Sequence, residues 1–247
     1  MTKRKVCKNM KREDIETTLS ILFEDIKNDP HHRYRSWEYC YKYFNENVKN
    51  KKRIDEDLTC LNLAYYLASW GMYRGSSVLL NKTYTFFKPI VEIFLKDNYK
   101  NLWEIDFKNK DYSKEEIKSI VENINELYYK IRNSIKESIP TKTLLTKILL
   151  GVMACTPAYD NFFKKGLKKI LRNDKRIIPY GNKHKDKICI KEFYALIEFY
   201  RNNKSAFDED YYICKSNQHE LLISPYPAMR LIDMYFWKKG QLDNEKR

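Results

Sequence analysis

The chain has 247 residues, of which 43% are hydrophobic and only six are glycine and seven proline. This apolar fraction can build a packed core and excludes an intrinsically disordered chain, while so few turn-forming residues argue against a sheet-rich protein. A formal net charge of +14 favours a polyanionic partner such as nucleic acid, although an AT-rich genome would produce the same lysine excess without any role in binding.

The N-terminal end and the cysteines bear on where the protein works. Residues 1–10 read as a flexible basic tail, and no apolar segment follows the charged start, so we expect no signal peptide. No apolar run approaches the ~18 residues that a membrane span needs. No two of the six cysteines have the close spacing of zinc or iron–sulfur motifs. We therefore expect a reduced, cytoplasmic protein that requires no metal or cofactor.

Apolar side chains recur every three or four residues along most of the chain, which is the spacing of an amphipathic helix. The clearest case is Ser113–Ser138, where Ser113 and Glu116 form a capping box and Pro140 lies just past the end. The other predicted helices are Arg12–Lys27, Tyr34–Asn47, Asp55–Trp70, Thr83–Lys96, Lys142–Cys155, Asn161–Arg172, Ile190–Asn202 and Pro227–Lys239. We therefore predict an all-α protein, a single domain of about nine helices over residues 1–247.

Two segments between these helices read differently. Tyr211–Cys214 has the composition of a short strand. Residues 173–188 form a lysine-rich loop, which is either a surface that contacts phosphate or simply a solvated loop.

The stretch LASWGMYRGSSVLLN, residues 67–81, places two of the six glycines between two apolar runs. Gly71 directly follows a predicted helix, where a left-handed cap favours glycine. Ser76 or Ser77 suits the N-cap of the next helix. The stretch is therefore predicted to be a tight corner between two helices.

The same corner is a candidate phosphate-binding site. Gly75 lets a ligand or another backbone come close, and a helix start with an arginine beside it attracts anions. The residues assigned to this site are Trp70, Arg74, Gly75, Ser76, Ser77 and, from the C-terminal part of the chain, Arg230. The alternative is a compact corner without a ligand, in which Arg74 caps the end of a helix.

A second candidate site lies in TKTLLTKILLGVMACTPAYDNFF, residues 141–163. One face of the predicted helix is apolar, and the other carries small residues and Lys147. The flanking apolar turns would partly desolvate this amine and make it a better nucleophile or base. Asp160 stands at the start of the next helix, so the two residues form a catalytic pair if they face one cavity. The alternatives are a lysine that extends to water and an aspartate that serves only as an N-cap.

The C-terminal segment SPYPAMRLIDMYFWKKG carries Arg230 and Asp233 three residues apart within an apolar helix. This spacing places both on one face, where they form either a buried pair that walls a site or an ordinary surface pair. None of the four histidines has the spacing of a metal ligand.

Three stretches together, YYLASWGMYRGSS, TKILLGVMACTPAYD and RLIDMYFW, resemble an all-helical family of uncharacterised bacterial proteins over residues 34–240. A lysine-bearing apolar helix followed by P-x-x-D is also similar, more distantly, to the helix-hairpin-helix DNA glycosylases. That resemblance implies a catalytic role for Asp160, and more loosely for Lys147. The sequence departs from that family in lacking the Gly-x-Gly of the hairpin and the iron–sulfur cysteines.

The sequence therefore predicts a nucleic-acid-binding protein, with DNA favoured over RNA as the partner and no membrane. Glycosylase-like chemistry on a flipped base would employ Lys147 and Asp160. Two alternatives remain: a protein-interaction module without catalysis, and a binder of a small phosphorylated ligand at Arg74.

Overall fold

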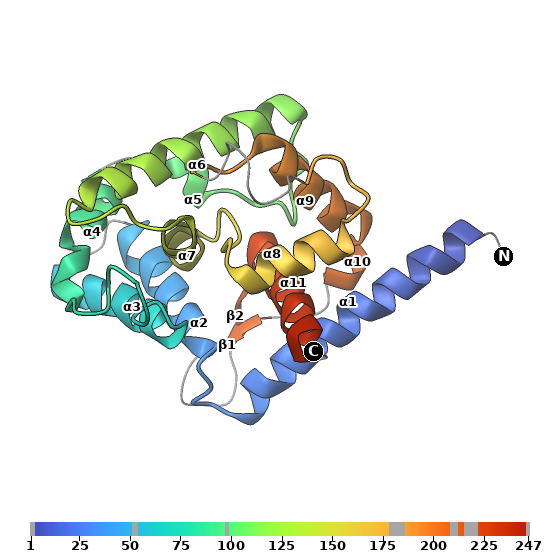
Figure 1. Cartoon of the computed structure of the whole chain (residues 1–247), viewed down its shortest axis with the longest axis horizontal. Coiled ribbons are helices and arrows are strands. Elements are labelled where there is room, and N and C mark those ends of the chain that lie inside the picture. The colour runs from blue at the N-terminus through green and yellow to red at the C-terminus, as the bar shows by residue number, and fades with distance from the viewer. Residues whose placement is uncertain are drawn as a thin grey trace.

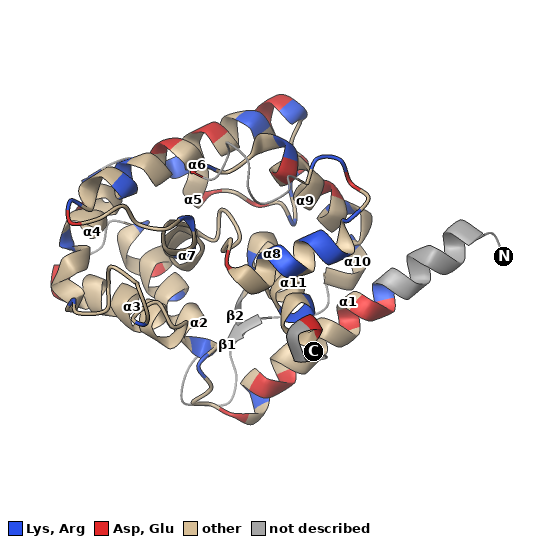
Figure 2. Cartoon of the chain, viewed as in Figure 1, with Lys and Arg blue, Asp and Glu red and all other residues tan. Residues whose placement is uncertain are grey.

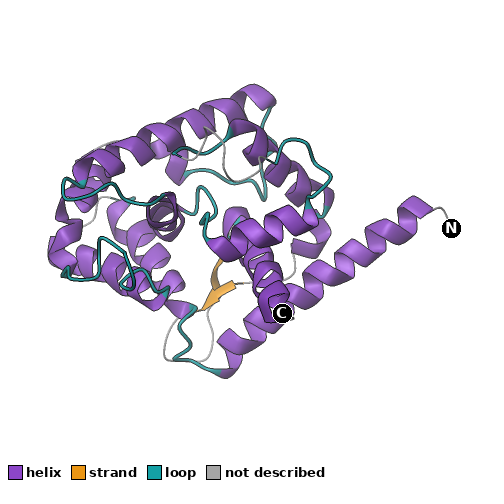
Figure 3. Ribbon diagram, in the orientation of Figure 1, coloured by secondary structure: helices purple, strands orange, loops and turns teal. Residues whose placement is uncertain are grey.

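Each helical period of the sequence becomes a helix in the computed structural model, which describes residues 3–50, 54–96, 99–177, 186–207, 212–214 and 222–245. Within these ranges there are eleven α-helices and one small β-hairpin (Figures 1 and 3). The helices are α1 (Lys3–Asn28), α2 (Arg35–Tyr43), α3 (Glu56–Ser69), α4 (Lys88–Lys96), α5 (Lys100–Trp103), α6 (Lys114–Ser134), α7 (Lys142–Met153), α8 (Asn161–Ile170), α9 (Ile190–Asn202), α10 (Lys204–Phe207) and α11 (Ala228–Glu245). The predicted all-α class is confirmed.

The predicted helices differ from the observed ones mainly at their ends. The π-helical turn η1 (Phe44–Val48) continues α2, and the 3-10 helix η2 (Tyr84–Phe87) precedes α4. The capping box of Ser113 and Glu116 is present at the start of α6. The expected tail, residues 1–10, is helical from Lys3 onward as the first part of α1, which extends away from the body in Figure 1.

Two predicted segments lie partly outside the described residues. The strand expected at Tyr211–Cys214 is present as β1 (Tyr212–Cys214), which pairs antiparallel with β2 (Leu222–Pro225). Of the basic loop, residues 173–188, the part from 178 to 185 falls outside the described ranges.

Helix α7 forms the centre of the core, because every residue from Leu144 to Met153 is buried. It is seen end-on near the middle of Figure 1, among α2, α3 and α6. Gly151 allows this close packing, since a Cβ atom there would lie 2.4 Å from a ring carbon of Tyr66 on α3. The small-residue face of α7 is therefore a helix-packing face.

Helices α8 and α11 approach each other through a pair of glycines. A Cβ atom on Gly166 would lie 1.9 Å from the carbonyl oxygen of Phe236, and one on Gly240 would lie 1.9 Å from the carbonyl oxygen of Phe162. The obstructing atoms are backbone, which cannot rotate away, so both positions require glycine. This contact fixes α11, with Arg230 and Asp233, against α8.

No helix in the described ranges has both the length and the apolar character needed to cross a membrane.

Candidate functional site

The end of α3 determines where Trp70 lies. Gly71 adopts the predicted left-handed conformation, with φ of 70°. Its N–H group donates to the carbonyl of Ala68, and the N–H group of Met72 donates to the carbonyl of Leu67, which together form a Schellman cap. The chain reverses at this cap, and Trp70 is the last residue before the reversal.

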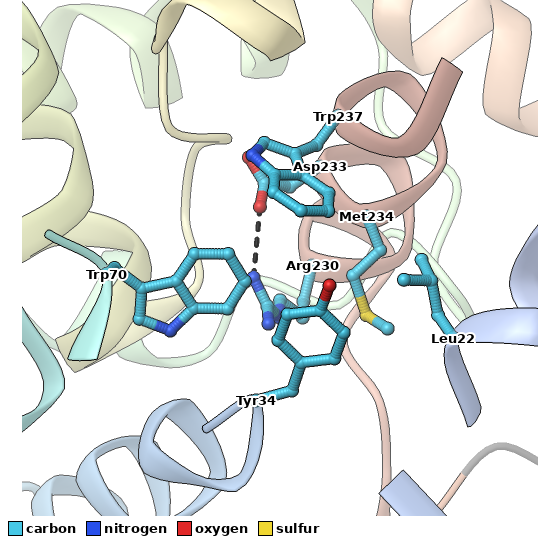
Figure 4. Close-up of a pocket in the computed structure, with 7 residues that line it drawn as sticks. All are labelled: Leu22, Tyr34, Trp70, Arg230, Asp233, Met234 and Trp237. Atoms are coloured by element: carbon cyan, nitrogen blue, oxygen red, sulfur yellow. Dashed lines mark hydrogen bonds and ion pairs between the residues drawn. The ribbon is translucent and has the colours of Figure 1, made fainter. Parts of the chain in front are cut away.

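The Trp70 indole is surrounded by aromatic rings and cations. Its ring stacks on Tyr34 at a centroid distance of 5.3 Å and meets Trp237 edge-on at 5.7 Å (Figure 4). The Lys147 amine and the Arg230 guanidinium each lie 5.1 Å from the centre of the Trp70 ring. Four of the residues assigned to function from sequence, Trp70, Lys147, Asp160 and Arg230, therefore lie close together, since Asp160 contacts Lys147.

Lys147 and Asp160 form a largely buried ion pair. The Lys147 amine donates to Oδ2 of Asp160 at 3.1 Å, and the side chains are 5% and 15% exposed. Oδ1 of Asp160 accepts the Phe163 N–H at 2.9 Å, so the predicted N-cap of α8 is confirmed. Asp160 thus has a structural role and also faces the amine.

Arg230 and Asp233 form a second buried pair on α11. Nη1 of Arg230 donates to Oδ2 of Asp233 at 3.0 Å, and neither side chain is more than 6% exposed. Oδ1 of Asp233 accepts the N–H group of Ala158 at 2.9 Å. Burial raises the pKa of Asp233 to about 6, against the opposing effect of Arg230. The pair is therefore buried, and the alternative of an ordinary surface pair is wrong.

The loop between α7 and α8 joins the two ion pairs. Ala154 ends α7 in a left-handed conformation, with φ of 50°, and the residues that follow up to Tyr159 are buried. The Tyr159 N–H group donates to Oγ1 of Thr146 at 3.0 Å, and Ala158 donates to Asp233. Side chains from α7 and α11 therefore hold the loop that presents Asp160.

A small cavity lies between the aromatic rings and the second ion pair, partly open to solvent (Figure 4). It is lined by Leu22, Tyr34, Trp70, Arg230, Asp233, Met234 and Trp237. Its volume of about 10 Å³ is close to the minimum for one water molecule. Nε of Arg230 is buried and has no hydrogen-bond partner among the described residues. A nucleobase would enter here only if the surrounding side chains moved.

The other predicted site residues lie apart from this cluster. Arg74 is exposed, and its guanidinium folds over Gly71, where an added Cβ atom would lie 2.9 Å from Nε. Gly75 has φ of 60°, and no described atom lies within 4 Å of an added Cβ atom. Gly75 is therefore a turn residue, and no part of the described chain approaches it closely.

The predicted N-cap at Ser76 or Ser77 is wrong. Oγ of Ser77 accepts the Leu79 N–H, two residues on, so the chain continues through further turns and η2 begins only at Tyr84. The two serines instead line a groove of about 230 Å³ that faces Thr141, the N-cap of α7.

Helix α8 has the most one-sided charge of the described helices that surround this site. Its inner side carries Phe163, Gly166 and Leu167, which are buried. The outer side and the turn that follows carry Lys164, Lys165, Lys168, Lys169 and Arg172. Figure 2 shows blue along α8, whereas blue and red alternate along α6. No acidic residue occurs from Asn161 to Arg172.

Sequence reasoning missed the buried acid Glu38 on α2, which is 2% exposed. Its carboxylate accepts the hydroxyl of Tyr226 and lies 3.6 Å from Nη1 of Arg35. Burial raises the pKa of Glu38. Glu38 stands four residues after Tyr34 and beside Trp37 on an apolar helix face, and this position was the sequence signal that could have indicated its burial.

No cluster of three potential metal ligands among His, Cys, Asp and Glu occurs in the described part of the chain. Comparisons with protein-family models, with curated proteins and with solved structures found no match to this chain.

Proposed function

We propose that the protein binds nucleic acid, DNA in preference to RNA, with the basic side of α8 against the phosphate backbone. The observation that carries this proposal is the charge of Asn161–Arg172, which has five cations and no acid. Four of the cations are exposed: Lys165, Lys168 and Lys169 on α8, and Arg172 just beyond its end. Lys169 is paired with Asp243 of α11 at 3.0 Å, so Lys165, Lys168 and Arg172 are the cations offered to phosphate. Such contacts release counterions from the backbone and supply affinity without reading sequence.

A titration of fluorescent DNA and RNA at two salt concentrations tests this proposal. With three phosphate contacts, from Lys165, Lys168 and Arg172, affinity for duplex DNA should fall roughly 40-fold between about 50 mM and about 200 mM salt. DNA and RNA of the same sequence, run in parallel, test the preference. No binding to either at the lower concentration would contradict the proposal.

Glycosylase-like chemistry is a second candidate, favoured by the 3.1 Å contact between Lys147 and Asp160. In this candidate, the amine attacks C1′ of an abasic sugar and water leaves, which gives an imine, while the carboxylate stabilises developing positive charge. Because the neighbouring cavity has room for about one water molecule, the Trp70 side chain would have to move first.

Borohydride trapping on abasic DNA tests the second candidate. Wild type should form a covalent adduct, and Lys147→Met should form none. A wild-type protein that binds DNA but forms no adduct would remove the lyase reaction and leave the binding proposal intact.

We also propose a cytoplasmic location. Cys40, Cys60 and Cys155 are buried free thiols, which is typical of proteins kept in a reducing compartment.

A further inference from the structure

The aromatic residues around Trp70 continue as far as the first turn of α8. Phe162 meets Trp237 at a centroid distance of 5.7 Å, Trp237 meets Trp70 at 5.7 Å, and Trp70 stacks on Tyr34 at 5.3 Å. Four segments that are distant in sequence thus contribute to one series of rings. We call this series, Tyr34, Trp70, Trp237 and Phe162, the aromatic ladder.

Two residues of the aromatic ladder are half-buried, and each packs against a ring that is buried. Trp237 and Tyr34 are 7% and 6% exposed and serve as supports. Phe162 and Trp70 are half-buried, and one face of Trp70 is covered by Tyr34. Large aromatic rings are normally covered in a folded chain, so the half-buried Phe162 offers a ring on which another flat group could stack, and Trp70 would offer a second once its neighbours move.

Exposed cations accompany the ladder at both ends. The Lys165 amine lies 6.0 Å from the Phe162 ring centre, and the Arg33 guanidinium lies 5.8 Å from Trp70 and 5.5 Å from Tyr34. Lys165 also belongs to the basic side of α8. Half-buried rings and exposed cations therefore occur together both at α8 and near the start of α2.

Basic grooves with interleaved aromatic rings suit single strands in particular. The faces of the bases are hidden in a duplex, whereas in a single strand each face can stack on an aromatic side chain. A duplex would gain only the phosphate contacts of α8, and a single strand would gain these and the stacking.

We infer that the ligand of this surface is an unpaired nucleic-acid strand, whose phosphates follow α8 and whose bases stack on Phe162 and reach Trp70 only when the side chains around it move. This inference rests on the proposed nucleic-acid binding and names its substrate class. Binding of this kind needs no hydrogen bonds to the edges of particular bases, since every base has a face that can stack.

Competing affinities for a single strand and a duplex of equal length test the inference. A labelled thymidine oligonucleotide should bind at least tenfold more tightly than the duplex at one salt concentration. Phe162→Leu, which keeps an apolar side chain against Trp237, should weaken single-strand binding about tenfold and leave duplex binding unchanged. Thermal melts establish that the variant is folded.

Tryptophan fluorescence gives a second reading on the same complex. The oligonucleotide should quench the emission of wild type and of the control Trp103→Phe, and Trp70→Phe should lose most of this quenching. Equal affinities for the two DNA forms, with no effect of Phe162→Leu, would overturn the inference while the proposed function stands. Absence of binding to either form would remove both.

Discussion

Lys147 donates a 3.1 Å hydrogen bond to the same carboxylate of Asp160 that caps the first turn of α8. Asp160 is thus both the N-cap of the basic helix α8 and the counter-charge of Lys147, whose side chain is only 5% exposed. The geometry ties the candidate reactive pair to the helix that we propose to contact phosphate.

Replacement of Asp160 by asparagine should separate the cap from the charge. Asparagine caps a helix about as well as aspartate, so the start of α8 should persist. The Lys147 ammonium would then be buried without its counter-charge, and we expect a loss of ~3 kcal/mol in the free energy of unfolding. Urea denaturation followed by far-UV circular dichroism measures this loss.

The double variant Lys147→Met/Asp160→Asn is the matched control. It removes both charges and keeps the cap, so it should be more stable than Asp160→Asn alone. If Asp160→Asn is as stable as wild type, the ion pair does not stabilise the fold.

The buried Asp233 should make stability depend on pH. Its pKa is raised to about 6 in the folded protein, against 3.8 as the ordinary value, because burial disfavours the charged carboxylate. The folded state therefore binds the proton more tightly, and this contribution is fully present below pH 4 and is lost as pH rises through 6.

The difference in unfolding free energy between wild type and Asp233→Asn isolates this group from other carboxylates. Wild type should lose about 2 kcal/mol relative to the variant between pH 4.5 and pH 7. A difference that stays constant over this range would show that Asp233 titrates near its ordinary pKa.

The contact between α8 and α11 should tolerate no side chain at Gly166 or Gly240. An added Cβ atom at either position would lie 1.9 Å from a backbone carbonyl oxygen, so one helix must shift. We expect each alanine variant to lose roughly 3 kcal/mol or more, at the upper end of overpacking effects. Ser119→Ala, on the exposed side of α6, is the control and should change the melting temperature little. Melting of Gly166→Ala at the wild-type temperature would contradict this helix contact.

Gly75→Ala should have a smaller effect, because only the backbone conformation opposes it. Gly75 has φ of 60° and open space around it among the described residues. The alanine should cost about 1 kcal/mol of stability and leave nucleic-acid affinity unchanged. A variant of wild-type stability that binds weakly would instead make Gly75 a ligand contact.

Features encoded by short-range patterns could be predicted from the sequence. The capping box at Ser113, the left-handed Gly71 and the cap at Asp160 each depend on residues within one turn of a helix. The same patterns predicted the nine longer helices among the described residues. Most of their ends lie within a few residues of the predicted ones, but α1 starts at Lys3 rather than Arg12 and α11 ends at Glu245 rather than Lys239. The serine cap failed because Ser77 bonds two residues ahead, an arrangement that its composition does not distinguish from a cap.

Features that depend on distant segments could not be predicted. Gly166 and Gly240 read as isolated glycines, since their importance arises only where α8 crosses α11. The sequence does not predict the contact of Lys147 with Asp160, because helical spacing does not fix how the chain returns after Pro157. The aromatic ladder likewise joins rings from four separate segments.

The salt dependence of duplex DNA binding tests most directly whether the basic side of α8 contacts phosphate. Each phosphate contact contributes about 0.9 to the slope of log affinity against log salt concentration. Lys165→Gln/Lys168→Gln should therefore make the slope shallower by roughly 2, while the control Lys114→Gln/Lys118→Gln on α6 keeps the wild-type slope. Equal slopes for wild type and both double variants would contradict the account.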